Sequence, residues 1–291
     1  DAAASTRSRH LKLVPEAPPP AEPDDAPPAG PRRPRHFRNS LLVLVSALSI
    51  LVTWWVINEA RTSSVQARYF AHLANQLTYR VDKGPSDSIR FPASSPYDTR
   101  LGYANLPGYL DRLKERNFEI TAQSRFSPKM VELAEMGFNP PYVEKMRAGL
   151  SILDCRAQPL FASSFPERYY AAFDQAPTLL VKSLLFIENR ELLDQKNPKR
   201  NPAVEWDRFS KAVFDKSVNT VTFREKRVAG GSTLATQIEK YRHSPEGRTS
   251  STSEKIQQMV SATLRAYKSG EDTTEVRRRI LVDYLNTVPL S

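Results

Sequence analysis

Hydrophobic and polar positions divide the chain into a polar tail, one long apolar run and several shorter amphipathic segments. The apolar run, Leu41 to Ile57, contains no charged residue. As a helix it would cover roughly 25 Å at about 1.5 Å per residue, slightly less than a hydrocarbon core. Trp54 and Trp55 lie near its end, where a membrane interface favours aromatic side chains. The pattern therefore predicts one transmembrane helix over residues 39–58.

Residues 1–38 form a tail that is dense in Pro and Ala and has few large apolar side chains. Such a segment buries too little surface to offset the entropy of ordering, so we expect it to be disordered. Four arginines precede the apolar run: Arg32, Arg33, Arg35 and Arg38. Glu59 and Arg61, of opposite charge, follow it. Since positive charge accumulates on the cytoplasmic side of a span, the sequence predicts a cytoplasmic tail and an extracytoplasmic remainder.

Residues 59–147 are predicted to form an extracytoplasmic stalk and a small α/β module. From residue 59 to residue 81, four apolar residues share one helical face and favour a helix that continues the span: Tyr69, Leu73, Leu77 and Val81. A second helix is expected around Leu106 and Leu113, followed by a short strand over residues 118–122. Nothing in this region looks catalytic. A spacer packed beside the next domain is favoured over a dedicated partner-binding role.

A strongly apolar helix is expected over residues 177–193, after two short strands and a turn in residues 148–164. The helix closes in Glu188, Asn189 and Arg190. A buried helix gains nothing in packing from a carboxylate and a guanidinium at its end, which marks a candidate site. Charged helix ends turned to solvent are also common, and on this segment alone both interpretations stay open.

The chain has enough hydrophobic residues to form a sizeable core, since they make up 40% of the 291 residues. The formal net charge of +10 suits nucleic acid, an anionic membrane surface or a phosphate-bearing substrate. The predicted topology disfavours nucleic acid, because the later basic clusters lie outside the cytoplasm. Cys155 is the single cysteine, which excludes an intramolecular disulfide and a cysteine zinc site; we expect it to pack in the interior. The four histidines show no metal-ligand spacing.

The segment Gly230 to Lys240, GGSTLATQIEK, combines a glycine pair with a helix start. Glycines allow a backbone to approach a ligand closely, and Ser232 or Thr233 suits the N-cap. From that start, Thr233, Gln237 and Lys240 share one polar stripe. A helix N-terminus that carries hydroxyls and a lysine suits an anion such as a diphosphate. The alternative is a plain glycine turn before a capped helix.

Two amphipathic helices are predicted near the end of the sequence. The first has five apolar residues on one face: Ile256, Met259, Val260, Leu264 and Tyr267. Ser251 and Glu254 at its start fit a capping box. The second is expected to bury Val276, Ile280, Leu281, Tyr284 and Leu285. Residues 277–279 are arginines in its first turn, where the helix dipole disfavours cations. They suit either an external anion or acidic partner, or a solvated charge run.

Four segments in this order resemble the motifs of the peptidoglycan glycosyltransferases of family 51, found in class A penicillin-binding proteins and monofunctional transglycosylases. They are the stretch from QAP to ENR at residues 175–190, GGSTLATQIEK at 230–240, EKIQQMVSATL at 254–264 and RRRILVDYLN at 277–286. The resemblance implies a mainly α, lysozyme-like glycosyltransferase domain over residues 148–291. Because Ser291 falls near where the family places a glycine, we expect a divergent member whose final helices are missing.

The resemblance further implies polymerisation of lipid II into glycan strands, with inversion and release of the lipid diphosphate, outside the bacterial cytoplasmic (inner) membrane. Glu188 corresponds to the general base. Substrate and diphosphate contacts are implied for Arg190, Gly231, Ser232, Thr233, Gln237, Lys240, Arg248 and Gln258, and structural roles for Asn189, Tyr284 and Asn286. A divalent cation, Mg or Mn, is expected to assist at the diphosphate, with no protein-held metal and no organic cofactor. Expected partners are lipid II, nascent glycan, the membrane and cell-wall synthesis proteins.

Departures from the motifs sustain a second hypothesis. The family's second glutamate aligns with Gln258, which cannot ionise, and its aspartate aligns with Asn189. Its histidine and glycine fall near Gln195 and Asn197. A catalytically weakened scaffold that binds lipid II or glycan and recruits cell-wall partners is therefore the alternative to an active polymerase. A third hypothesis, a lytic enzyme with one carboxylic acid, is disfavoured because the segment Gly230 to Lys240 fits a diphosphate better than a neutral sugar.

Overall fold

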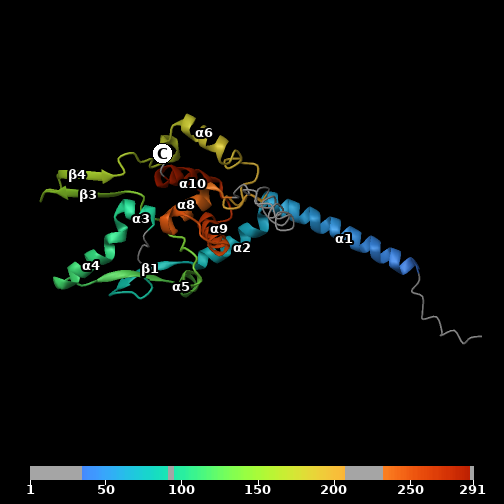
Figure 1. The fold of residues 1–291 in the computed structure, drawn as a ribbon, viewed down its shortest axis with the longest axis horizontal. Coiled ribbons are helices and arrows are strands. Elements are labelled where there is room, and N and C mark those ends of the chain that lie inside the picture. The colour runs from blue at the N-terminus through green and yellow to red at the C-terminus, as the bar shows by residue number, and fades with distance from the viewer. Residues whose placement is uncertain (1–34, 91–94, 207–231, 289–291) are drawn as a thin grey trace, which may run out of the picture. The chain divides into compact units, whose positions relative to one another are not determined.

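The computed structural model describes residues 35–90, 95–206 and 232–288 (Figure 1). The chain divides into two compact units, Asp1–Leu51 and Val52–Ser291. Almost all of the tail predicted for residues 1–38 lies outside the described residues. Helices dominate the described elements, so the mainly helical fold predicted from the apolar spacing is confirmed.

Helix α1, Arg35–Thr62, contains the predicted span. Its segment Asn39–Thr62 has a mean hydropathy of 2.3 and is long and apolar enough to cross a membrane. Within it, the Ser49 hydroxyl donates to the Val45 carbonyl at 2.8 Å, which satisfies a polar group that apolar surroundings would leave without a partner. The helix continues past residue 58, its predicted end.

Helix α2, Ser64–Gln76, is a separate helix rather than a stalk that prolongs α1. Between the two, Ser63 has φ 53° and ψ 31°, a left-handed conformation that breaks the helical run. The buried face of α2 consists of small residues: Ala67, Ala71 and Ala74. The apolar face predicted for this segment is correct at the buried Leu77 and the half-buried Leu73, and wrong at its other two positions. Tyr69 is exposed, and Val81 lies beyond the helix, in a strand.

The alanine face of α2 packs against helix α9, Thr252–Ala266 (Figure 1). Phe70 of α2 stacks on Tyr267, with 6.4 Å between the ring centroids. Helix α5, Pro128–Glu135, joins the same region through a cluster of buried side chains, Ala74, Leu77, Met130, Leu133 and Leu264. Residues 59–147 thus share a core with the later helices, and the structure shows no domain boundary at residue 147.

Strands β1, Tyr79–Lys83, and β2, Ala122–Phe126, form an antiparallel pair with Val81 opposite Ser124. The chain between them forms three short helices: α3, Pro96–Leu101; η1, Tyr103–Asn105; and α4, Leu106–Glu115. The predicted helix around Leu106 is confirmed. The strand predicted over residues 118–122 is wrong, because the segment that pairs with β1 begins only at Ala122.

The two strands predicted in residues 148–164 are confirmed. Strands β3, Ala148–Leu153, and β4, Pro159–Phe165, form an antiparallel hairpin. In its turn, the Asp154 carboxylate accepts hydrogen bonds from the backbone N–H groups of Arg156 and Gln158, each at 2.8 Å. Cys155 lies exposed in this turn, so the interior packing predicted for it is wrong.

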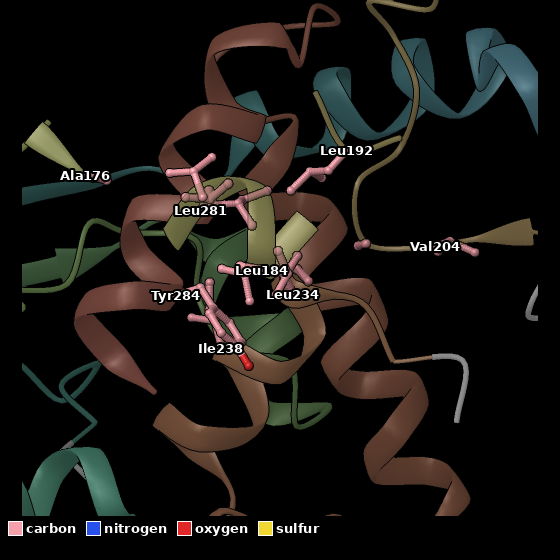
Figure 2. Packing of buried hydrophobic residues seen from close by; sticks show 13 residues of the cluster. Ala176, Leu184, Leu192, Val204, Leu234, Ile238, Leu281 and Tyr284 are labelled. Carbon is pink, nitrogen blue, oxygen red and sulfur yellow. The ribbon is translucent and has the colours of Figure 1, made fainter. Parts of the chain in front are cut away.

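The main core lies between helices α6, Thr178–Ile187, α8, Leu234–His243, and α10, Thr274–Thr287, with α9 contributing Ala262. Two short helices, η2, Phe173–Gln175, and η3, Pro245–Gly247, precede α6 and α9 respectively. Figure 2 shows the side chains at the centre of this core, Leu184, Leu234, Ile238, Leu281 and Tyr284. The apolar spacing of α10 predicted its buried face correctly.

The buried face predicted for α9 is correct except at its start. Leu264 and Tyr267 are fully buried, but Ile256 is 54% exposed. The physical reason is that the buried face begins with polar residues, Gln258 and Ser261. A prediction from apolar positions alone therefore assigns the wrong side of the first turns of this helix to the core.

A buried ionic cluster connects residues 139–147 to α8 and α9. Arg265 Nε lies 2.6 Å from Glu239 Oε1, and Arg265 Nη2 lies 3.2 Å from Glu144 Oε1. His243 Nε2 lies 3.1 Å from the same Glu144 oxygen. Burial opposes the ionisation of Glu144, but the charges of His243 and Arg265 outweigh it and hold the pKa of this carboxyl well below its usual range. The cluster is complete only when all three segments are in place.

Candidate active site

Glu188 is the C-cap residue of α6 and is half-buried. The inner side of α6 is apolar, with Val181 and Leu184 in the main core, and this packing fixes the position of the helix end. The backbone N–H of Glu188 donates to the Leu184 carbonyl at 2.9 Å. A carboxylate at a helix C-terminus is opposed by the helix dipole, typically by about 0.3–1 kcal/mol. Stability therefore gives no reason for an acid at this position.

Gln237 of α8 and Tyr284 of α10 form a hydrogen-bonded group with Glu188. Gln237 Nε2 donates to Glu188 Oε2 at 2.9 Å, and the Tyr284 hydroxyl donates to Gln237 Oε1 at 3.2 Å. Burial, together with the negative charge of Glu188, raises the pKa of Tyr284, so the hydroxyl stays protonated. The fold thus brings together the expected base, one expected substrate contact and one expected structural residue from three distant segments.

Thr233 is the N-cap of α8, one of the two residues predicted for that position. Its side chain is buried, and its hydroxyl accepts a hydrogen bond from the Thr236 N–H at 3.3 Å. The same hydroxyl donates to the Ala203 carbonyl at 3.3 Å. These bonds stabilise the helix start, and the diphosphate contact predicted for Thr233 stays a prediction. Ser232 beside it is half-buried, and Gly231 lies outside the described residues.

Three cationic side chains predicted to contact a diphosphate reach solvent. Arg190 is exposed, with its guanidinium carbon 4.0 Å from the centre of the Phe186 ring. Lys240 is half-buried on α8, about one turn beyond Gln237, and Arg248 is exposed just after η3. No ion pair joins Lys240 to another residue in the ranges that the structure describes. These cations are open to an anion arriving from solvent.

Gln258 of α9 is 5% exposed, and both ends of its amide have partners within the protein. Its Nε2 donates to Ser244 Oγ at 2.9 Å, and its Oε1 accepts from the Thr249 hydroxyl at 3.1 Å. The amide therefore holds the loop before α9, and the substrate contact predicted for it stays a prediction. At the helix start, Ser251 Oγ accepts from the Glu254 N–H at 3.1 Å, the capping role expected for this pair.

Two asparagines hold backbone on either side of the site. Asn286 is buried and makes two bonds to one residue, since its Nδ2 donates to the Tyr170 carbonyl at 2.8 Å and its Oδ1 accepts from the Tyr170 N–H at 2.9 Å. Asn189 Oδ1 accepts from the Glu191 N–H at 3.0 Å and shapes the turn that follows Glu188. Both side chains act on the backbone rather than on a ligand.

Arg277 has a role that the sequence analysis missed. It is 2% exposed, so the external anion predicted as one option for the arginines of this turn is wrong for this one. Its guanidinium donates to five backbone carbonyls, that of Thr273 at the start of its own helix at 3.3 Å and, in the segment after Glu188, those of Leu192 at 3.3 Å, Asp194 at 2.6 Å, Asn197 at 3.0 Å and Pro198 at 3.2 Å. The sequence feature that could have revealed its burial is its spacing, because Arg277 shares a helix face with Ile280, Leu281 and Tyr284.

The described residues include no group of three or more His, Cys, Asp or Glu side chains that could hold a metal ion. A cavity of about 530 Å³ is lined by residues that include Arg242, Arg265 and Ile238. Glu188 and Gln237 do not line it, so this cavity is separate from the hydrogen-bonded group at the end of α6.

Residues 158–291 match the family model described as Transglycosylase. The match begins at the start of β4 and includes α6, α8, α9 and α10, and with them Glu188, Gln237 and Tyr284. The resemblance seen in the four motifs is thereby confirmed: this part of the chain is similar to the Transglycosylase family, as expected of a divergent member. Comparisons with curated proteins and with solved structures found no match.

Proposed function

We propose that this protein is a membrane-anchored peptidoglycan glycosyltransferase that polymerises lipid II into glycan strands. The observation that carries the proposal is the Glu188–Gln237 hydrogen bond at the end of an apolar helix in a transglycosylase domain. A lysozyme-like arrangement of that domain is part of the proposal. So is anchoring by α1, with the tail in the cytoplasm and the domain outside the cytoplasmic (inner) membrane, which the apolar segment Asn39–Thr62 supports.

Glu188 serves as the general base in this proposal. It takes the proton from the 4-hydroxyl of the acceptor sugar while that oxygen forms a bond to C1 of the donor sugar. The bond between C1 and the diphosphate oxygen breaks, and its electron pair leaves with the lipid diphosphate. Attack from the side opposite the leaving group inverts C1. The half-buried position of Glu188 and the bond from Gln237 support the role, because they hold the carboxylate in one orientation.

The leaving diphosphate requires positive groups close by. Lys240, Arg190 and Arg248 are proposed for this task, with Ser232 as a neutral donor, because their side chains are at least partly open to solvent. A divalent cation, Mg or Mn, would be held through the oxygens of the diphosphate itself, since the described acidic side chains form no metal-binding group. Bound there, it would neutralise further charge on the leaving group.

Polymerisation of fluorescent lipid II by the full chain in lipid nanodiscs tests this function. We expect the wild-type protein to make glycan strands and Glu188→Gln to make none, because the amide keeps the shape of the side chain and cannot take a proton. Glu191→Gln is the matched control, since Glu191 is exposed and pairs with Arg200 at 2.6 Å. Wild-type protein that makes no strands, with or without Mg or Mn, would contradict the proposal.

One observation favours the alternative, a scaffold that binds lipid II or glycan and recruits cell-wall partners. At the position that aligns with the family's second glutamate, Gln258 is buried, uncharged and fully bonded within the protein. A scaffold would bind lipid II in nanodiscs without making strands, and Glu188→Gln would leave its binding unchanged. Strand synthesis that disappears in Glu188→Gln rules the scaffold out.

A further inference from the structure

In the hydrogen-bonded group of Glu188, Gln237 and Tyr284, the donors and acceptors determine which way the Gln237 amide is oriented. An ionised carboxylate can only accept hydrogen bonds, whereas an amide donates at its nitrogen and accepts at its oxygen. Gln237 places its nitrogen 2.9 Å from Glu188 Oε2 and its oxygen 3.2 Å from the Tyr284 hydroxyl. Only this orientation of the amide allows both bonds while Glu188 is ionised.

The opposite orientation of the amide would change the state of Glu188. With the Gln237 oxygen facing Glu188, a hydrogen bond forms only if the carboxyl carries a proton, and a protonated carboxyl is no longer a base. In that orientation the Tyr284 hydroxyl would lose its acceptor. Tyr284 is 5% exposed and packs in the main core (Figure 2), where a hydroxyl without an acceptor is costly. The tyrosine therefore opposes the flip.

We propose that Tyr284 is a positioning residue which, through the amide of Gln237, keeps Glu188 in the proton-accepting state. The effect of Tyr284 on catalysis rests on the proposed function. The orientation of the Gln237 amide does not depend on that function. The phenol is suited to the task because it remains a neutral donor across the neutral pH range. Its rigid ring, fixed among apolar side chains, has a single place for the hydroxyl.

The groups described around Glu188 come from α10, from α8 and from its own segment. Tyr284 faces it from α10 and is the titratable group whose own ionisation the Glu188 charge affects. Gln237 faces it from α8 and carries no charge. On the segment of Glu188 itself, just beyond the end of α6, the Arg190 guanidinium lies over the Phe186 ring and its Nε donates to the Phe186 carbonyl at 3.4 Å. The amide of Gln237, bonded to the phenol of Tyr284, thus contacts the carboxylate directly.

The pH dependence of strand synthesis by Tyr284→Phe tests the inference. The variant keeps the ring and removes the donor, so the acidic limb of the kcat profile should move to higher pH, with synthesis roughly three- to tenfold slower on that limb and KM for lipid II unchanged. Tyr267→Phe is the matched control. Tyr267 is also fully buried, and its hydroxyl donates to the Lys199 carbonyl at 2.7 Å, so its loss should lower stability and leave the pH profile unchanged.

A second measurement does not depend on activity. A carbodiimide reacts with protonated carboxyls, and mass spectrometry of the peptide that contains Glu188 gives the pH at which half of it reacts. We expect this pH to rise in Tyr284→Phe and in Gln237→Met, which removes the half-buried amide and with it both hydrogen bonds of the group, and to stay constant in Tyr267→Phe. An unchanged half-reaction pH in both site variants would overturn the inference. Inactive wild-type protein would overturn the proposed function instead. The labelling experiment would still show whether Tyr284 affects the protonation of Glu188.

Discussion

Arg277 joins the start of α10 to the chain that follows Glu188, because its guanidinium donates to four backbone carbonyls there. Asn197 O also accepts from the Arg200 N–H at 3.1 Å and Pro198 O from the Thr273 N–H at 2.8 Å, so the guanidinium matters most to the carbonyls of Leu192 and Asp194. Burial lowers the pKa of Arg277, yet an arginine remains cationic at any physiological pH. A single side chain thus holds the segment that carries the turn after Glu188.

Arg277→Met tests this assignment. The methionine fills a similar volume but removes the donor that serves the Leu192 and Asp194 carbonyls and one of the donors to Asn197 and Pro198, so we expect the free energy of unfolding to fall by roughly 2–4 kcal/mol in chemical denaturation. Arg278→Met is the control, because Arg278 pairs with Glu275 at 3.1 Å near the surface, where such pairs contribute less than about 1 kcal/mol. Equal stability of the two variants would show that Arg277 does not hold this segment.

At the scale of single residues, the sequence predicted which side chains carry chemistry better than it predicted their partners. Glu188 was visible as a charge at the end of an apolar helix. Thr233 and Gln258 looked like ligand contacts, because hydroxyl and amide groups serve helix caps and ligands equally well. Only their partners, Ala203 and Ser244, show that both groups act within the protein. Those partners come from segments whose proximity no local pattern reports.

At the scale of elements, helices α6 and α10 were predicted from the spacing of their large apolar residues, although α6 ends at Ile187 rather than at residue 193. Helix α2 did not, because its buried face is made of alanines, which give a weak hydrophobic signal but allow two helices to approach closely. The break at Ser63 was also invisible, since serine seldom adopts a left-handed conformation. Strand β2 was misplaced because its register depends on pairing with β1.

Ala67→Leu tests whether α2 belongs to the domain. Ala67 is fully buried in contact with the region around Tyr267, so a larger side chain should lower the free energy of unfolding by roughly 1–3 kcal/mol through overpacking. Arg68→Leu is the control on the exposed side of the same helix. A free stalk would tolerate both substitutions equally, and that result would contradict the packing of α2 on α9.

At the scale of the whole molecule, charged residues connect segments that the sequence suggested were separate modules. Glu144 lies in residues 59–147, whereas His243, Glu239 and Arg265 belong to α8 and α9. A charge far along the chain gives no local sign of its partner, so the composition predicted a basic protein without revealing a buried ionic cluster. We expected a domain boundary at residue 147 because no local sequence pattern indicates these contacts.

The ionic cluster predicts how stability depends on pH. Burial opposes the charged form of His243, but Glu144 and Glu239 outweigh it and raise the pKa of the imidazole above its ordinary 6.5. The stabilisation is therefore fully present below pH 6.5 and is lost as pH rises through the pKa of the folded state. Glu144, whose pKa is lowered, contributes stability that is present above pH 4.5 and is lost as pH falls below it.

His243→Gln should remove the alkaline part of this dependence. In thermal unfolding between about pH 6 and pH 9, we expect the midpoint of the wild type to fall with rising pH and that of His243→Gln to change much less. His72→Gln, on the exposed side of α2, should keep the wild-type slope. A slope that persists in His243→Gln would mean that another group titrates.

The measurement that tests the central claim most directly is the rate of glycan strand synthesis from lipid II by wild-type protein, Glu188→Gln and Glu191→Gln in the same nanodiscs. Removing a general base typically costs a factor of about 100 or more, whereas an exposed ion pair contributes little. We predict a loss of at least roughly 100-fold for Glu188→Gln and less than about twofold for Glu191→Gln. Strand synthesis by Glu188→Gln at the wild-type rate would contradict the account.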